Sequence, residues 1–432
     1  MKKFFLLFAM IIFVSPLFAL MPFFTGYAGF LTDVGNDADS DSDVFFDPEI
    51  TADAYFRGQL DFGGNLLLRG EFFIEADDLV DQNLFEDPVA ENAFFQIEEI
   101  SATYRLASGN SSHYFSAFLG NFEPIGSDMF LQKQFGISPI GSYLTESWHG
   151  MSGASVYPFY GLGLSYVLHP KLPWALGFFF YANKETVSSD TEEAVVTNIL
   201  NSDVRFASVL SWLTADLSAG FSFPLENADD SGDQVILIVR KVQLHAGLDL
   251  LLGNKNIFSF FLQGGFNKFT LNPSSSSSSS DNKLSFSDLY FIIEPRLTLR
   301  QCNINLSVFN IPSESADDML YLKPILDSDS TISNLLGANL CIVTDHLYLG
   351  NINFTFGIHT SFVFTDSVLA DAIASPANIM NWTKKLYVTP FAAMPVFGGE
   401  VKAEVSASVL DMMDLQSIKN ALKASVGFRS QF

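Results

Sequence analysis

Long stretches in which apolar and polar side chains alternate at every second residue constrain this chain more than any other feature. The clearest pair, of 13 and 11 residues, is Ile50 to Phe62 and Leu66 to Ala76, joined by Gly63-Gly64-Asn65. Successive strand side chains point to opposite faces, so each stretch predicts a two-faced strand, and the glycine-rich link predicts a tight turn. Both strands exceed the ~5–6 residues typical of soluble sheets and suit a tilted strand that crosses a membrane.

The same alternation recurs to the end of the chain. Further strands are predicted at 26–31, 100–106, 114–122, 162–168, 174–180, 204–212, 217–223, 235–251, 257–270, 289–299, 304–308, 337–343, 347–364, 386–394, 401–409 and 422–432. The patterns of Gly26–Leu31 and Gly337–Val343 support a strand least clearly. A turn is predicted at Thr344–His346, after the second of these strands. We therefore expect an all-β fold, a transmembrane antiparallel up-and-down barrel of 16 to 18 strands, or 14 with a plug.

Short connections alternate with long ones, as in transmembrane barrels with tight periplasmic turns and long outer loops. Long connections are predicted at Glu185–Ser202 and Asn310–Leu336, among others. The longest, Glu123–Ala154, is either an outer loop or a plug inside the barrel. We expect residues 20–432 to form a single barrel domain.

The last stretch, Leu422 to Phe432, ends on an aromatic residue, with Val426 and Phe428 on the same apolar face. It resembles the C-terminal signal of outer-membrane β-barrel proteins of diderm bacteria, although Ser430 stands where that family usually has an apolar residue. The resemblance implies that Val426, Phe428 and Phe432 are read by the barrel-insertion machinery. In its richness in Phe, Asp and Ser the chain is similar to uncharacterised outer-membrane barrels of spirochaetes.

The first residues have the pattern of a secretory signal peptide. Lys2 and Lys3 precede the apolar run Phe4–Val14, and a break at Ser15-Pro16 leads to Ala19. We predict a signal peptide over residues 1–19, cleaved between 19 and 21. Beyond Val14 no apolar run has the ~18 residues that a spanning helix needs. The chain is therefore expected in the cell outer membrane, in contact with its lipid.

Charge is concentrated in the expected outer loops. The chain is 48% hydrophobic and contains 45 Phe, yet its net charge is −25. Four loops, 33–49, 77–92, 185–202 and 226–233, hold 7, 6, 4 and 4 acidic residues, 21 together, and no Lys or Arg. An acidic mouth favours cations and repels nucleic acid.

Unlike the acidic residues, seven of the eight arginines fall on the polar faces of the predicted strands, and only Arg240, beside a phase shift at Lys241, does not. A charge that faces lipid at mid-depth costs ~2–4 kcal/mol, so these side chains should point into the lumen. The predicted pore-lining residues are Arg57, Arg69, Arg105, Arg205, Arg296, Arg300 and Arg429, among Asp53, Asp61, Glu71, Glu75, Glu99 and Glu294. We favour an open pore, because so many strands enclose more space than side chains fill. The alternative is a salt-bridged interior with no pore.

No motif predicts an enzyme, a cofactor or a metal. Asp37, Asp39, Asp41 and Asp43 alternate in a way that hard cations tolerate, but Ser42 stands where an EF-hand loop needs glycine, so a solvated loop is the expectation. HExxH, GxSxG and glycine-rich phosphate loops are missing from the sequence. The two cysteines, Cys302 and Cys341, either pair or remain thiols.

Three functions remain open. The first is a porin-like channel for small hydrophilic solutes, biased toward cations. The second is a transporter of hydrophobic compounds resembling the long-chain fatty acid transport barrels, although the Asn-Pro-Ala motif of that family is not found near the expected mature N-terminus. The third is a surface barrel whose loops act as an adhesin. The sequence leaves the solute and the oligomeric state undetermined.

Overall fold

The computed structural model describes most of the chain between Phe23 and Phe432. The described residues are 23–36, 48–63, 65–76, 79, 93–147, 155–156, 160–187, 195–227, 237–239, 242–254, 256–271, 289–316, 319–327, 332, 334–349, 352–365, 384–413 and 421–432. The expected signal peptide, the polyserine tract at 274–280 and the aspartates Asp37, Asp39, Asp41 and Asp43 lie outside them.

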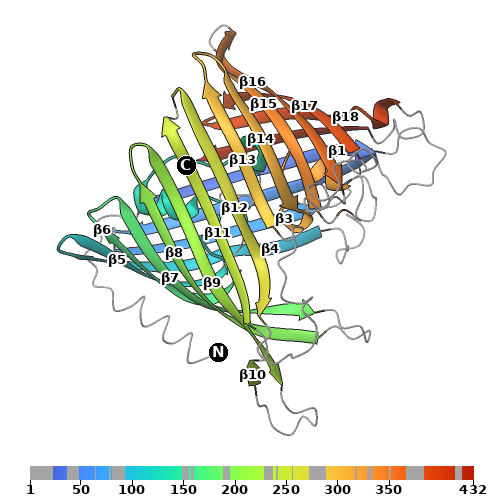
Figure 1. Cartoon of the computed structure of the whole chain (residues 1–432). Helices are drawn as coiled ribbons and strands as arrows, with labels where there is room; N and C mark the ends of the chain where they lie inside the picture. The colour runs from blue at the N-terminus through green and yellow to red at the C-terminus, as the bar shows by residue number, and fades with distance from the viewer. Residues whose placement is uncertain are drawn as a thin grey trace.

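The described strands form one antiparallel sheet that closes into a barrel (Figure 1). Each wall strand pairs with its neighbours in sequence, and β1 (Phe23–Asn36) closes the ring by pairing with both β2 (Pro48–Phe62) and β19 (Leu422–Gln431). Of the 19 described strands, the three-residue β10 (Leu237–Val239) pairs only with the far end of β9 (Leu213–Asn227), which also pairs with β11 (Val242–Asn254), so eighteen strands form the wall. The predicted fold class, an all-β up-and-down barrel, is confirmed.

Most wall strands are long enough to cross a membrane at a tilt. In chain order the wall strands, together with the short β10, are β1 (Phe23–Asn36), β2 (Pro48–Phe62), β3 (Leu66–Ala76), β4 (Ala93–Ser108), β5 (Ser111–Asn121), β6 (Tyr160–Pro170), β7 (Trp174–Val187), β8 (Val195–Val209), β9 (Leu213–Asn227), β10 (Leu237–Val239), β11 (Val242–Asn254), β12 (Phe258–Leu271), β13 (Leu289–Thr298), β14 (Asn303–Pro312), β15 (Asn334–Leu349), β16 (Ile352–Thr365), β17 (Lys384–Val396), β18 (Gly399–Ser408) and β19 (Leu422–Gln431).

The two faces of the wall follow the predicted alternation. In β2, Ala54 and Phe56 are exposed on the outside, whereas Asp53, Tyr55 and Arg57 are buried on the inside. The same holds around the ring, where exposed large hydrophobic residues mark the outer surface. An apolar outer wall around a polar interior is the arrangement of a membrane-spanning barrel.

Both ends of the barrel chain meet at the end with the tight turns. Phe23 pairs with Asp61, just before the turn between β2 and β3. At the seam, the backbone N–H of Gly26 donates to the Phe432 carbonyl at 2.6 Å, and the N–H of Phe432 donates to the Gly26 carbonyl at 2.9 Å. The ring of Phe432 lies outside the barrel, 5.8 Å from that of Phe24. The terminal aromatic residue thus closes the ring.

Several predicted connections are wrong in their bounds. No turn occurs at Thr344–His346, because β15 continues to Leu349 and a bulge between Thr344 and Leu347 absorbs the change of phase. The predicted loop Glu185–Ser202 is shorter, since Val187 of β7 pairs with Val195 of β8. Strands here continue beyond the stretch in which apolar side chains alternate, because pairing of the backbone does not require that pattern.

Two other predicted boundaries between strand and loop are also displaced, because the strands continue beyond the alternating stretch. Gly26–Leu31 is the centre of the 14-residue β1, and Asp33, expected in an acidic loop, is buried inside the barrel 3.5 Å from Lys423. The predicted loop Asn310–Leu336 begins after Pro312 and ends before Asn334. Between them lie two short helices, α4 (Ser313–Ala316) and α5 (Lys323–Asp327).

Both cysteines are free thiols in the structure, so the open question of a disulfide is answered against pairing. Cys341 is buried on β15, and Cys302 lies half-buried in the turn between β13 and β14. We expect a membrane-impermeant maleimide to modify one thiol per folded chain and two after denaturation, as measured by mass spectrometry. A Cys302→Ser variant should take no label while folded. Protection of both thiols in the wild-type protein until reduction would contradict this result.

Candidate functional site

The long connection between β5 and β6 enters the barrel instead of covering it. The longest described part of this connection, residues 122–147, contains helix α3 (Met129–Phe135) and the 3-10 turn η1 (Tyr143–Thr145). Ile125, Phe130 and Leu131 are completely buried in one apolar cluster with wall residues such as Phe179 and Phe261. We call residues 122–147 the plug segment. Of the two alternatives for Glu123–Ala154, the structure therefore supports a plug for the described part.

Arg205 of β8 anchors the first half of the plug segment. Its side chain is fully buried, and its Nε donates to Asp216 of β9 at 2.8 Å. It also donates to the backbone carbonyl of Glu123, and its guanidinium lies 4.8 Å from the centre of the Phe130 ring. One arginine thus combines an ion pair, a backbone hydrogen bond and a cation–π contact, each strengthened by the exclusion of water.

In the middle of the plug segment, the backbone of Ile140 and Gly141 is held by two charged side chains, Asp128 of the plug segment and Arg296 of the wall. Asp128 accepts hydrogen bonds from the backbone N–H groups of Ile140 and Gly141, at 2.8 and 2.7 Å. Arg296 of β13 donates to the carbonyls of the same two residues, at 2.8 and 2.9 Å. Glu294 accepts from Arg296 at 2.6 Å and also accepts from Ser142. The plug segment is therefore tied to β13.

The end of the plug segment meets a second inward segment, residues 319–327. Glu146 accepts from Lys402 of β18 at 2.6 Å and lies 3.4 Å from Arg429 of β19. Its backbone carbonyl accepts from the N–H of Leu320 at 2.9 Å, and its side chain accepts from Tyr321 at 3.4 Å. Burial alone would raise the pKa of Glu146, but Lys402 and Arg429 outweigh it and lower that pKa to about 2. The junction stays ionised at physiological pH.

A third charged cluster lies on β2, β3 and β4. Arg57 is 3.5 Å from Glu71 and 3.4 Å from Glu99, and Arg69 is 3.5 Å from Glu99. The Nη1 of Arg57 also reaches the sulfur of Met129 in the plug segment, at 3.4 Å. Sequence alternation placed these residues on one face, and the structure brings them into contact.

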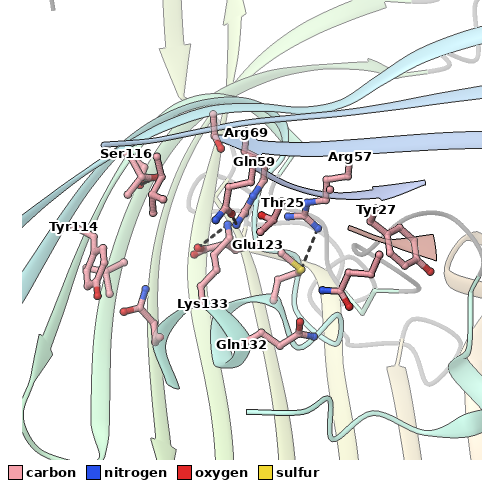
Figure 2. Close-up of a pocket in the computed structure, with 18 residues that line it drawn as sticks. Thr25, Tyr27, Arg57, Gln59, Arg69, Tyr114, Ser116, Glu123, Gln132 and Lys133 are labelled. Atoms are coloured by element: carbon pink, nitrogen blue, oxygen red, sulfur yellow. Dashed lines mark hydrogen bonds and ion pairs between the residues drawn. The ribbon is translucent and has the colours of Figure 1, made fainter. Parts of the chain in front are cut away.

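Beside this cluster lies a cavity of about 360 Å³ between the plug segment and the wall (Figure 2). Its wall comes from the tight-turn halves of β1 to β6 and from the end of β19, with residues such as Gln59, Arg69 and Tyr114. Its inner side comes from the plug segment, where Gln132 and Lys133 point toward it. The cavity is large enough to hold a small solute.

The other predicted pore-lining residues have different surroundings. Asp53 is buried inside β2, and Asp61 and Glu75 are half-buried. Arg105 is exposed near the tight turn between β4 and β5, where it donates to Ser112 at 3.3 Å. Arg300 is exposed in the turn that follows β13. The terminal Val426 and Phe432 are exposed on the outer surface.

Sequence reasoning missed the residues of the plug segment and the aromatic residues that receive it. Glu123, Asp128, Lys133 and Glu146 gave no signal, because their partners are distant in the chain. Phe179 did give a sequence signal, because its position in the alternation of β7 places it on the face that points into the lumen. An aromatic residue on the lumen face indicates that something packs against it.

Asp128 gives the plug segment a dependence on pH. Burial raises its pKa to about 6, with Asp216 contributing and Arg296 and the two N–H donors opposing. Ionised Asp128 therefore costs free energy inside the barrel, a cost that is absent below pH 3.8, grows between pH 3.8 and about 6, and is fully present above that range. Lowering the pH from 7 to 5 should favour the inserted plug segment by about 1 kcal/mol.

The expected result is fewer large current fluctuations at pH 5 than at pH 7 in single-channel records. Neighbouring Asp216, Asp249, Glu294, Arg205 and Arg296 also surround this region, so the comparison with Asp128→Asn isolates the residue. That variant should lose this part of the pH dependence. An unchanged pH profile in Asp128→Asn would refute the assignment.

No helix among the described residues is long and apolar enough to cross a membrane. Within the same ranges, no group of three or more His, Cys, Asp or Glu side chains is arranged to hold a metal ion.

No protein-family profile matches the chain. A search of curated proteins also finds no match. Among solved structures the chain is similar to engineered variants of the porin of Rhodopseudomonas blastica. A triple mutant of that porin shares 12% identity with a TM-score of 0.43, and another variant shares 10% with a TM-score of 0.42. Each match covers 95% of this chain and all of the porin chain.

Proposed function

We propose that this protein is an outer-membrane channel of the porin type that passes small hydrophilic solutes through a lumen narrowed by the plug segment. One observation carries the proposal: a closed eighteen-stranded wall, apolar outside, surrounds charged and polar side chains and a cavity. A wall of this size encloses more space than its own side chains fill. Part of that space is occupied by the plug segment and by residues 319–327, which together narrow the passage.

The proposed location is the outer membrane, reached through the signal peptide at residues 1–19 and the terminal signal Val426, Phe428 and Phe432. The charge pattern supports a preference for cations, because four of the expected outer loops together hold 21 acidic residues, of which Asp33 is buried inside the barrel, and no Lys or Arg. A ring of negative charge at the mouth raises the local concentration of cations. The insertion machinery, membrane lipid and small solutes are its proposed partners.

The test is the conductance of the refolded protein in a planar bilayer, with the reversal potential under a salt gradient. We expect stepwise openings with a cation preference that declines when the acidic residues of loop 77–92 are changed to Asn and Gln. A protein that inserts, stays heat-modifiable on a gel and never conducts would refute the channel.

The two alternative functions receive less support. Transport of hydrophobic compounds requires an apolar passage, but the apolar cluster around the plug segment is buried, and most residues that line the cavity carry polar or charged side chains. The adhesin hypothesis depends on loops that lie mostly outside the described residues. Bound acyl chains in the purified protein would favour the transporter of hydrophobic compounds. Binding to host proteins through the loops would favour the adhesin.

A further inference from the structure

The ionic groups around the cavity already neutralise one another. Lys133 lies 3.0 Å from Glu123, and the two arginines that line the cavity are paired with Glu71 and Glu99 behind them. The cluster contains three cations, Arg57, Arg69 and Lys133, and three carboxylates, Glu71, Glu99 and Glu123, so its net charge is zero. An incoming ion would have to compete with existing pairs in a site that holds no excess charge for it.

The remaining polar lining is neutral and is rich in groups that both donate and accept hydrogen bonds. Four glutamines, Gln59, Gln132, Gln134 and Gln431, and several hydroxyls, including Ser116, line the cavity. The amide of Gln59 is oriented by Arg69, whose Nη2 donates to its oxygen at 2.7 Å. Amides and hydroxyls are matched by ligand hydroxyls, which also donate and accept, whereas carboxylates only accept and ammonium groups only donate.

The cavity also offers aromatic surface and a suitable size. Tyr27 and Tyr114 contribute their rings to the lining, and Tyr27 is held in place by a stack on Tyr55 at 5.3 Å between ring centres. Its volume of about 360 Å³ corresponds to about a dozen waters at ~30 Å³ each. This lies at the lower end of the range of small-molecule sites, about 300–1,000 Å³.

We propose that the cavity binds an uncharged, hydroxyl-rich solute of the size of a small sugar. The inference rests on the proposed function for the route of entry, because the solute reaches the cavity through the lumen. The glutamine amides and Ser116 hydrogen-bond the hydroxyls of the solute, and Tyr114 covers its apolar face. The ion pairs of Arg57, Arg69 and Lys133 shape the site, and because they are already neutralised they give it no preference for an ion.

Three probes of nearly the same size test the charge preference: glucose, gluconate and glucosamine. Equilibrium dialysis of the detergent-solubilised protein measures binding without any need for conduction. We expect saturable binding of glucose and at least fivefold weaker binding of the anion and the cation. Equal or tighter binding of gluconate or glucosamine would overturn the proposal, and so would binding of none of the three.

Paired variants locate the site. Ser116 and Ser165 are register partners on β5 and β6 and are almost equally buried, but only Ser116 lines the cavity. Ser116→Ala combined with Gln132→Met should weaken glucose binding about five- to tenfold, the loss expected for one or two hydrogen bonds. Ser165→Ala combined with Gln96→Met, outside the cavity, should leave it unchanged. Equal loss in both pairs would refute the location.

The same protein in a bilayer separates this inference from the channel. Glucose that binds in detergent while the bilayer shows no conductance would refute the channel and leave the site in place. Conductance without glucose binding would keep the channel and remove the site. If both hold, glucose should interrupt the current in the wild type and do so about five- to tenfold less often, at equal concentration, in the Ser116→Ala and Gln132→Met protein.

Discussion

Replacement of residues 122–159 by a short Gly-Ser linker is expected to raise the single-channel conductance severalfold. The ends of the segment are already adjacent, because Asn121 at the end of β5 pairs with Tyr160 at the start of β6. A tight linker can therefore join the two strands without disturbing the wall. Removal of Phe130, Leu131 and their neighbours opens the lumen, since an eighteen-stranded wall on its own encloses a wide aqueous space.

The second inward segment limits the size of this effect. Residues 319–327 stay in the barrel, where Tyr321 stacks on His359 at 3.5 Å between ring centres. The deletion should thus give a larger but not a fully open pore. Removal of the polyserine tract 274–280, as a control, should leave the conductance unchanged. Conductance that does not change when residues 122–159 are removed would show that ions pass the plug segment freely.

The wall could be predicted from sequence because its pattern is local. A lipid-facing strand must place apolar residues at every second position, and this rule alone gave the bounds of β3, Leu66–Ala76, as the structure has them. The rule fails where a strand leaves the membrane. For that reason the predicted turn at Thr344–His346 and the loop at Glu185–Ser202 were wrong.

The candidate site could be predicted only in part, because its contacts join distant parts of the chain. Alternation placed Arg57, Arg205 and Arg296 on the lumen face, but it does not identify Met129, Glu123 or Ile140 as their partners. Those pairs depend on how the plug segment enters the barrel. Its chain forms short irregular structure whose path is decided by packing against the wall. The sequence permitted a plug and contained no local pattern that required one.

Loss of the Arg205 side chain is expected to give the largest fall in stability of any single lumen substitution considered. In Arg205→Met the carboxylate of Asp216 stays buried without its guanidinium, and the carbonyl of Glu123 loses its donor. Removing one partner of a buried ion pair costs about 3–5 kcal/mol, because the other charge is left without compensation. The free energy of unfolding, measured by urea titration of the lipid-reconstituted protein, should fall by that amount.

Two further variants separate charge compensation from packing. Arg205→Met with Asp216→Leu should recover part of the loss, since an apolar pair replaces the ion pair, while the nearby Asp249 prevents full recovery. Arg105→Met, at an exposed arginine on the same kind of lumen parity, should stay within about 0.5 kcal/mol of the wild type. If Arg205→Met were as mild as Arg105→Met, the plug segment would be held by its apolar contacts and by Arg296 and Lys402, without a contribution from Arg205. A large loss of stability in Arg205→Met, partly recovered by Asp216→Leu, would instead mean that the Arg205–Asp216 ion pair fixes the plug segment. The barrel wall and the plug segment would then fold as one unit.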